Sequence, residues 1–325
     1  MLSSDVRFEF SITKKHFTMK KISNILVVFT LLLTGFVYGQ QDPHYTQYMY
    51  NQNILNPAYA GSRGDLSIGL LGRTQWVGID GAPNTQTLNI HSAVGRGLGV
   101  GLSAIHDKIG PVEESNLYVD LSYTLKTSEK GNLAFGLKGG FTFMNVGLLT
   151  ETDVIDPSDP AFGEDYNDNY PNIGAGLYYY TDKFYVGLAV PGILEQYKFN
   201  TSGLQFSDVS DKMHWFGTFG YVFDLKDNLK LKPSTMLKMV EGAPISIDLN
   251  ASLFINELFE IGLSWREGDS IDAIIGVQAT PDIRIGYAYD YTLTNLGRYN
   301  SGSHELMLLF DLDFSKKHIK SPRFF

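Results

Sequence analysis

The sequence contains no cysteine among its 325 residues. This absence excludes disulfides, thiolate catalysis, zinc–thiolate sites and a lipid-modified N-terminal cysteine. Basic residues are also scarce, because 26 Lys and Arg face 35 Asp and Glu and give a formal net charge of −9. A chain with this balance lacks the basic footprint of a nucleic-acid-binding protein, so we expect no nucleic-acid partner.

Long hydrophobic runs are missing as well. One apolar run, residues 25–36, follows two lysines and precedes the small residue Gly39. It is too short to favour a membrane-spanning helix. The order of positive charge, apolar run and small residue indicates a secretory signal peptide, with an uncleaved anchor as the alternative. We expect cleavage after Gly39, which leaves 1–39 outside the fold, and Met19 is a better translation start than Met1.

The chain does contain a series of short segments in which apolar residues alternate with polar or small ones. Alternation of period two is typical of a strand with one apolar face. Turn residues or charges separate the segments, and no convincing amphipathic helix interrupts them. The pattern predicts fourteen strands, at residues 65–76, 84–93, 97–106, 116–126, 132–145, 172–180, 183–190, 213–223, 228–239, 244–255, 258–266, 270–279, 282–293 and 303–314.

Two architectures place apolar residues on one face of every strand. A soluble sandwich or barrel packs them inward, whereas a transmembrane barrel turns them outward to lipid. Charges such as Lys138 and Arg284 on the opposite face favour the membrane barrel, as do aromatic residues such as Trp215 towards the segment ends. Connections after even-numbered segments are short, as in outer-membrane barrels. The longest connections follow odd-numbered segments, at 107–115, 146–171, 191–212 and 294–302.

The predicted fold is therefore all-β, a transmembrane antiparallel up-and-down β-barrel of 14 strands over residues 64–314. Short inner turns with an even strand number place both termini in the periplasm. We expect 40–63 to be a periplasmic lead-in segment and 315–325 a periplasmic tail. The long connections 191–212 and 294–302 have room for a further strand. Pro233 cannot donate to a sheet ladder, which predicts a bulge or a local break at that position.

Metal chemistry has one weak candidate. Asp165, Asn167 and Asp168 are the best calcium ligands in the acidic stretch 148–172, but an EF-hand-like arrangement needs alternate ligands, a central Gly and a distal Glu that this stretch lacks. A solvated acidic loop is the favoured interpretation. The seven histidines show none of the spacings of a metal site.

Catalytic and cofactor motifs are equally weak. The glycine-rich stretch 97–101 resembles a nucleotide loop, but it lies inside an alternating segment with no helix after it. We interpret these glycines as small residues on the lumen face. No Ser/His/Asp set comes with a nucleophile elbow, so we expect neither a cofactor nor an enzyme. A barrel-type outer-membrane lipase or protease is the one enzymatic alternative.

Residues 40–62 are rich in Tyr and Asn and have no lipid-compatible pattern. One interpretation is a lead-in that packs at the periplasmic end of the barrel or enters the lumen as a plug. The other is a partner-docking epitope, since Tyr is enriched among the residues that dominate binding energy. Arg73 is more simply a lumen charge paired with a carboxylate. The candidate partner-binding residues are Tyr48, Asn56, Pro57, Tyr59, Arg73 and Trp76.

The same stretch carries a family resemblance. Its residues are Asp42-Pro43, Tyr45 to Met49, the run Leu55-Asn56-Pro57-Ala58-Tyr59-Ala60-Gly61-Ser62, then Arg73, Gln75-Trp76 and Gly81-Ala82-Pro83, with Pro322-Arg323-Phe324-Phe325 at the end. The combination resembles the PorP/SprF family of outer-membrane proteins of Bacteroidetes-type bacteria, which is associated with type IX secretion and gliding. The resemblance covers about residues 40–325.

The resemblance implies a non-enzymatic protein that assists type IX secretion, or anchors a large secreted protein such as an adhesin at the cell surface. It also implies partners: the secreted cargo, a periplasmic OmpA-like peptidoglycan-binding protein, components of the secretion and gliding machinery, and outer-membrane lipid. Two alternatives stay open. One is a porin or a transporter of hydrophobic compounds, and the other is a structural link between membrane and peptidoglycan.

Overall fold

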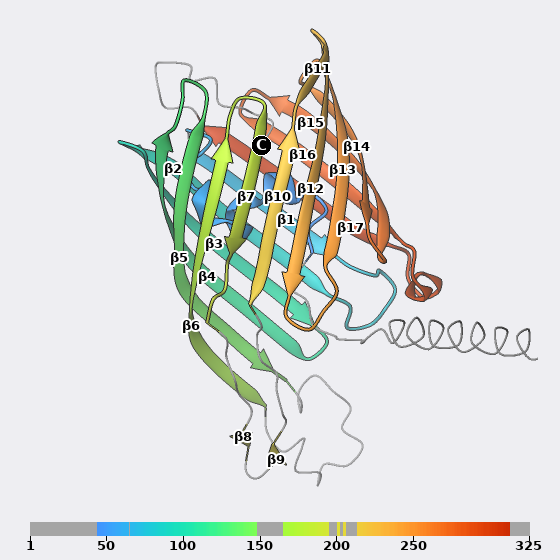
Figure 1. Ribbon diagram of the computed structural model, residues 1–325. Coiled ribbons are helices and arrows are strands. Elements are labelled where there is room, and N and C mark those ends of the chain that lie inside the picture. The colour runs from blue at the N-terminus through green and yellow to red at the C-terminus, as the bar shows by residue number, and fades with distance from the viewer. Residues whose placement is uncertain are drawn as a thin grey trace, which may run out of the picture. The chain divides into compact units, whose positions relative to one another are not determined.

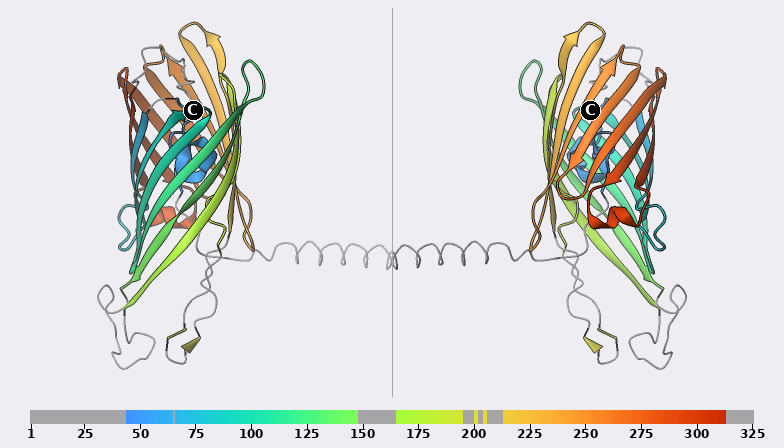
Figure 2. Two further views of the ribbon diagram at one scale, coloured as in Figure 1. Left: turned by 90° about the vertical axis from the view of Figure 1, so that its left-hand side faces the viewer. Right: turned by 90° about the vertical axis from the view of Figure 1, so that its right-hand side faces the viewer.

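The computed structural model describes residues 44–64, 66–147, 165–194, 200–201, 204–205 and 213–312. These residues form a closed ring of antiparallel strands, and a few short helical turns, coloured blue, lie inside it (Figure 1). The two side views show the same turns enclosed by the strands (Figure 2). In these ranges there is no helix that is long and apolar enough to cross a membrane.

The ring consists of β1 (Leu66–Thr74), β2 (Asn84–Gly95), β3 (Leu98–Ile109), β4 (Val112–Lys126), β5 (Asn132–Val146), β6 (Tyr166–Tyr180), β7 (Phe184–Val190), β10 (His214–Tyr221), β11 (Phe223–Lys226), β12 (Leu229–Val240), β13 (Ser246–Ile255), β14 (Phe259–Arg266), β15 (Ser270–Thr280), β16 (Ile283–Thr292) and β17 (Ser303–Leu312). Each strand pairs with the next along the chain, and β17 pairs with β1. β10 and β11 count as one strand, because both pair with β12 and only Val222 separates them. The ring therefore has 14 strands, as predicted.

Closure occurs at the seam between the first and the last strand. The β1–β17 ladder runs without a register shift from Leu66 opposite Leu312 to Thr74 opposite His304. In hydrocarbon every backbone N–H and C=O that lacks a partner costs several kcal/mol. A sheet with two open edges is therefore excluded from a membrane, and the seam removes both edges at once.

The long connections all lie at one end of the ring. The connections after β2, β4, β6, β11, β13 and β15 have two to five residues. At the other end 147–165, 191–213 and 293–302 are long and 75–83 is of intermediate length, whereas 110–111, 241–245 and 267–269 are short. Outer-membrane barrels keep short turns in the periplasm and long loops outside. We therefore call the end with the long connections, the lower end in Figure 1, the outer end.

The prediction of a long loop at 107–115 is wrong. β3 and β4 continue through this stretch to a tight turn at Gly110, whose φ of 55° lies in the left-handed region that glycine adopts readily. The charged residues face one another across the ladder, with Lys108 opposite Glu113. Opposite charges on paired strands stabilise such an extension.

Two other long connections contain short elements. Between β7 and β10 the chain forms β8 (Asn200–Thr201) and β9 (Leu204–Gln205), which pair with each other and not with the ring. The connection between β16 and β17 contains a single 3-10 turn, η4 (Asn295–Arg298). Neither connection adds a strand to the barrel.

The predicted irregularity at Pro233 is confirmed, although it falls on the neighbouring strand. β12 continues through Pro233, and the ladder opposite is interrupted between Tyr221 of β10 and Phe223 of β11. Proline has no N–H to offer this ladder. On the other side Val222 remains paired, because its N–H donates to the Lys183 carbonyl at 2.7 Å and continues the ladder with β7.

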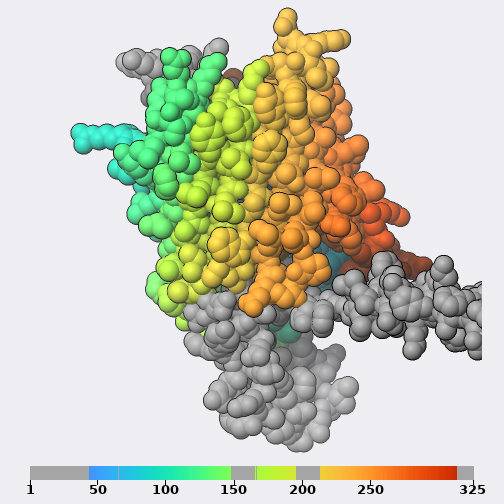
Figure 3. All heavy atoms as spheres, in the orientation of Figure 1, coloured from blue at the N-terminus to red at the C-terminus, as the bar shows by residue number. Residues whose placement is uncertain are grey.

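The two faces of the wall differ in chemistry. Inward-facing Lys232, Asp272 and Glu305 are each 0% exposed, whereas outward-facing Leu137 and Leu263 are 66% and 64% exposed. A soluble barrel would show the opposite arrangement. The outward side chains of adjacent strands form a continuous surface in the space-filling view (Figure 3). This is the orientation of a transmembrane barrel, with apolar residues outside and polar residues inside.

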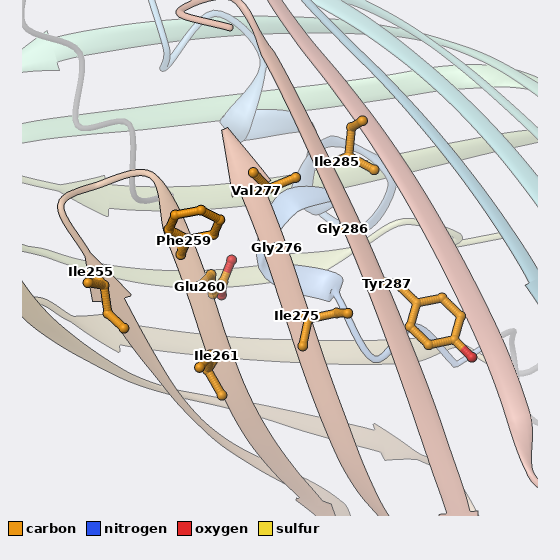
Figure 4. A pocket seen from close by; sticks show the side chains of 10 residues that line it. All are labelled: Ile255, Phe259, Glu260, Ile261, Ile275, Gly276, Val277, Ile285, Gly286 and Tyr287. Atoms are coloured by element: carbon orange, nitrogen blue, oxygen red, sulfur yellow. The ribbon is translucent and has the colours of Figure 1, made fainter. Parts of the chain in front are cut away.

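A hollow of about 480 Å³ lies in the wall across β13 to β16. Outward-facing Ile261, Ile275 and Tyr287, from three adjacent strands, are among its lining residues (Figure 4). Glu260 also lines it, but the carboxylate of Glu260 is engaged by groups inside the barrel. The hollow is thus part of the apolar, lipid-facing surface.

The outward orientation predicts the cost of a charge near the middle of β14. We expect Leu263→Arg to destabilise the barrel in lipid vesicles by about 2–4 kcal/mol, because an arginine at the bilayer midplane is desolvated. Denaturant unfolding in vesicles measures this difference. Leu263→Ile is the matched control and should change stability little. Equal stability of Leu263→Arg and the wild type would contradict the lipid-facing assignment.

Candidate functional site

The barrel encloses its own N-terminal segment, residues 44–64, which we call the plug. It forms three short turns, η1 (Tyr48–Tyr50), α2 (Gln52–Leu55) and η2 (Pro57–Tyr59). Every residue from 45 to 60 is buried. The turn η2 begins where it does because the Asn56 side chain accepts a hydrogen bond from the Ala58 N–H, and Pro57 suits the first helical position.

The plug is held near the outer end by the carboxylate of Glu305 on β17. Glu305 accepts hydrogen bonds from the backbone N–H groups of Thr46 and Gln47, at 2.9 and 2.7 Å. The Thr46 hydroxyl donates to Asp290 on β16 at 2.8 Å. Arg73 on β1 joins the two carboxylates, with nitrogen–oxygen distances of 2.7 Å to Asp290 and 3.3 Å to Glu305. These charges compensate one another where water is excluded.

Tyr50 holds the middle of the plug. Its hydroxyl donates to Glu260 at 2.6 Å, and the same carboxylate oxygen accepts from Arg284 at 3.1 Å. The ammonium of Lys232 lies 4.9 Å from the centre of the Tyr50 ring, within cation–π range. Burial, reinforced by the Glu260 carboxylate, raises the pKa of Tyr50 well above its ordinary value. Tyr50 therefore stays protonated and acts as a donor.

A second charged contact lies on the opposite wall. The Asn53 side-chain amide donates to Asp120 on β4 at 3.0 Å and to Ser103 on β3 at 3.1 Å. Asp120 also pairs with Lys138 on β5 at 3.0 Å, and Lys138 donates to the Asn53 carbonyl at 3.3 Å. Strands on both sides of the lumen thus bind the same short segment.

Glycines on the inner wall make room for the periplasmic end of the plug. A Cβ on Gly136 would meet the backbone nitrogen of Ala58 well inside contact distance, and one on Gly99 would meet the carbonyl oxygen of Ala60. A Cβ on Gly176 would meet the side-chain oxygen of Asn56, the atom that caps η2. We call these three glycines of β3, β5 and β6 the glycine cradle. The interpretation of the 97–101 glycines as small lumen-facing residues is confirmed at Gly99.

The last residues of the plug are fixed before β1 begins. Arg63 forms an ion pair with Asp311 on β17 at 2.5 Å. Tyr59 packs edge-on against His91 and Tyr178, with ring centres 5.2 and 5.3 Å apart. The plug therefore runs from the outer half of the lumen, at Thr46, to its periplasmic end, at Arg63.

The structure separates the predicted partner-binding residues into two groups. Five lie inside the barrel and are buried, so a partner can reach them only if the plug leaves the lumen: Tyr48, Asn56, Pro57, Tyr59 and Arg73. Trp76 is the exception and lies partly exposed in the connection between β1 and β2. Arg73 is paired with carboxylates of the lumen, as expected.

The expected periplasmic position of 40–63 differs from the observed one for the residues that the structure describes. Residues 44–63 lie within the lumen, which is the plug arrangement of the two lead-in alternatives. The segment lies in the lumen because the wall carries buried charges that need partners, and the polar side chains and backbone of the segment supply those partners.

Several residues that matter here are not evident from motifs. The contacts between the plug and the wall mostly join residues that are more than 60 positions apart in the sequence. They involve Glu305, Asp290, Glu260, Asp120 and Arg63. The available signal is the alternation along each strand, since the four carboxylates occupy the polar face of predicted strands. This alternation identifies a charge that faces the lumen but not its partner.

The weak calcium candidate gains no support. Asp165, Asn167 and Asp168 lie at the start of β6, where Asp168 accepts a hydrogen bond from the Asn169 N–H at 2.9 Å. Among the residues that the structure describes, no cluster of three or more His, Cys, Asp or Glu is arranged to hold a metal ion. The acidic stretch 148–164 lies outside the described residues.

The glycine cradle predicts a strong effect of one methyl group. We expect Gly136→Ala to displace the plug, to cost about 1–3 kcal/mol of stability through overpacking, and to give an ion current in planar bilayers where the wild type gives none. Gly139→Ala is the control, because a Cβ at Gly139 meets nothing within 4 Å. A silent and fully stable Gly136→Ala barrel would contradict the fit of the plug.

The Glu305 network predicts a difference between a buried and an exposed charge. Glu305→Gln leaves Arg73 with one carboxylate partner fewer, and removing one member of a buried pair costs about 3 kcal/mol. Glu257→Gln is the control, since it removes an exposed pair with Lys230 and such pairs contribute little. Denaturant unfolding of both variants in vesicles compares them. Similar losses would show that the buried network does not hold the plug.

Comparisons with known proteins agree with this architecture. The chain is similar to the toluene transporter TbuX of Ralstonia pickettii, with 10% identity over 80% of this chain and 92% of that one and a TM-score of 0.50. It is also similar to a FadL homologue of Pseudomonas aeruginosa, with 12% identity over 79% of this chain and 93% of that one and a TM-score of 0.45. At such identities the likeness to TbuX concerns the fold alone.

Sequence comparison gives the family. No curated protein matches the chain. The family described as type IX secretion system membrane protein PorP/SprF matches residues 37–310, which is most of the chain. The closed membrane barrel, its plug and this match lead to one conclusion: the chain is an outer-membrane β-barrel that belongs to the PorP/SprF family.

Proposed function

We propose that this protein is a non-enzymatic barrel that assists type IX secretion, or anchors a large secreted protein such as an adhesin at the cell surface, with a link to gliding motility. Family membership supplies the connection to type IX secretion. The main observation in favour of the anchoring role is that the plug fills the lumen. Buried hydrogen bonds and ion pairs attach the plug to both sides of the wall, at Glu305 and Glu260 on one side and at Asp120 on the other.

A filled lumen argues against the porin alternative. A diffusion pore needs a continuous aqueous path, and barrels that conduct keep a wide polar channel open. Here residues 45–60 are buried within the ring. A transporter of hydrophobic compounds would have to move the plug on every cycle and break the contacts of Thr46, Tyr50 and Asn53. An electrically silent wild type would therefore favour the anchor over the porin.

The two ends of the barrel suit different partners. Long connections at the outer end offer area for a secreted protein, while the short turns at the other end bring periplasmic components close to the membrane. We propose that the secreted cargo meets the outer end. We propose that an OmpA-like peptidoglycan-binding protein and the secretion or gliding machinery meet the periplasmic end, including the tail 315–325. A structural link to peptidoglycan alone would need only the periplasmic contacts.

Deletion of the gene tests the proposed function. We expect at least one large secreted protein to disappear from the cell surface and to accumulate in the medium or inside the cell, because its attachment site is lost. Quantitative proteomics of surface, medium and cell fractions measures the redistribution. Complementation with wild type or with Gly139→Ala should restore display. An unchanged surface fraction after deletion would reject the proposal.

A further inference from the structure

The plug begins at the opening of the lumen at the outer end of the barrel, which we call the outer mouth. His44 is partly exposed, whereas every residue from 45 to 60 is buried. Three charged residues lie close enough to act on His44 electrostatically: Lys238, Arg266 and Arg73. Each of them lies within two residues of the outer end of its strand. His44 therefore marks the outer mouth.

From this mouth the plug runs through the lumen in one direction, and β17 serves as a ruler. The Thr46 N–H binds Glu305, the third residue of β17 from its outer end. Arg63 pairs with Asp311, the last residue but one of the same strand. Six residues of strand separate the two carboxylates, which is a rise of about 20 Å. The plug thus crosses most of the barrel once and does not turn back.

The chain before His44 is too short to return to the periplasm. Residues 40–43 span at most about 14 Å when fully extended, whereas the apolar band of an outer-membrane barrel is about 25 Å tall. The route back through the lumen is also occupied, because residues 45–60 are buried there against the wall. The chain before His44 must therefore leave through the outer mouth.

The same reach decides between the two interpretations of the apolar run 25–36. An uncleaved anchor would hold this run in the inner membrane, and eight peptide units would have to connect Phe36 to His44. Eight units span at most about 28 Å. The whole periplasm and the apolar band of the outer membrane would lie between the two residues. An uncleaved anchor is therefore incompatible with a barrel that contains the plug.

We propose that the signal peptide is removed before the plug takes its place, and that the new N-terminus leaves the lumen through the outer mouth and lies on the cell surface. The two termini of the mature chain are then on opposite sides of the membrane, because β17 ends at Leu312 at the periplasmic end. An even strand number alone predicts both termini in the periplasm. The inference does not depend on the proposed role in secretion.

The absence of cysteine from the chain allows a direct test. Asp42→Cys introduces a single thiol two residues before the described plug. A maleimide coupled to a polymer too large to cross the outer membrane reacts with an accessible thiolate. We expect intact cells to be labelled to the same level as permeabilised cells, measured as a mass shift in gel electrophoresis. Gln41→Cys, one residue further from the plug, should give the same result.

Two matched variants calibrate the labelling. Asp80→Cys lies exposed in the outer connection 75–83 and should react on intact cells. Glu129→Cys lies exposed in the short connection 127–131 and should react only after permeabilisation. An Asp42→Cys thiol that behaves like Glu129→Cys would overturn the inference. Absence of labelling in both states would overturn it as well, because residue 42 would then be enclosed in the barrel.

Removal of the signal peptide has its own readout. Intact-mass spectrometry of the barrel purified from outer membranes measures where the chain begins. We expect a single species that begins near Gln40, because a small residue such as Gly39 precedes a signal-peptidase cut. An outer-membrane barrel that still carries residues 25–36 would overturn the inference, whatever its labelling pattern.

Discussion

The requirement that no backbone polar group meets hydrocarbon unpaired determines most of this structure. It forces the strands into a ring, and the ring closes through an unbroken ladder between β1 and β17. Once the ring is closed, side chains alternate between lipid and lumen along each strand, apart from a few register shifts near strand ends. The lipid face cannot hold charge, so the charged residues of the strands gather inside, where Lys232, Asp272 and Glu305 are fully buried. The interior of the barrel is thus a consequence of its exterior.

Charges gathered inside create a second requirement, which the plug meets. A ring of eight strands can be filled by its own side chains, whereas wider rings leave an aqueous channel or need a plug. In this ring of 14 strands the plug provides donors where the wall has carboxylates. The Thr46 and Gln47 N–H groups bind Glu305, and the Tyr50 hydroxyl binds Glu260. The glycine cradle lets the backbone of the plug approach the wall closely.

Much of this fold follows from the sequence, because one physical rule repeats along it. The alternation of apolar and polar residues locates all fourteen strands, and Arg73 and Gly99 are correctly predicted to face the lumen. The limits of the sequence are also physical. The plug has no periodicity, and its contacts join residues such as Thr46 and Glu305 that are 259 positions apart. At 107–115 charged residues interrupt the alternation of apolar and polar residues, while the ladder continues.

The filled lumen constrains how such a protein can act between two compartments. The plug occupies the lumen and has buried contacts with both sides of the wall, so we expect partners to meet the barrel at its ends. The two ends differ, because only one of them carries long connections, and the connections at that end together contain many more Asp and Glu than Lys and Arg. A closed ring also resists force well, since each strand is bonded on both sides and no edge is available at which the sheet can peel. These are properties that the proposed anchoring role requires. A carrier would need a weakly bound plug, whereas this plug is bound by carboxyl groups at both of its ends, at Glu305 and at Asp311.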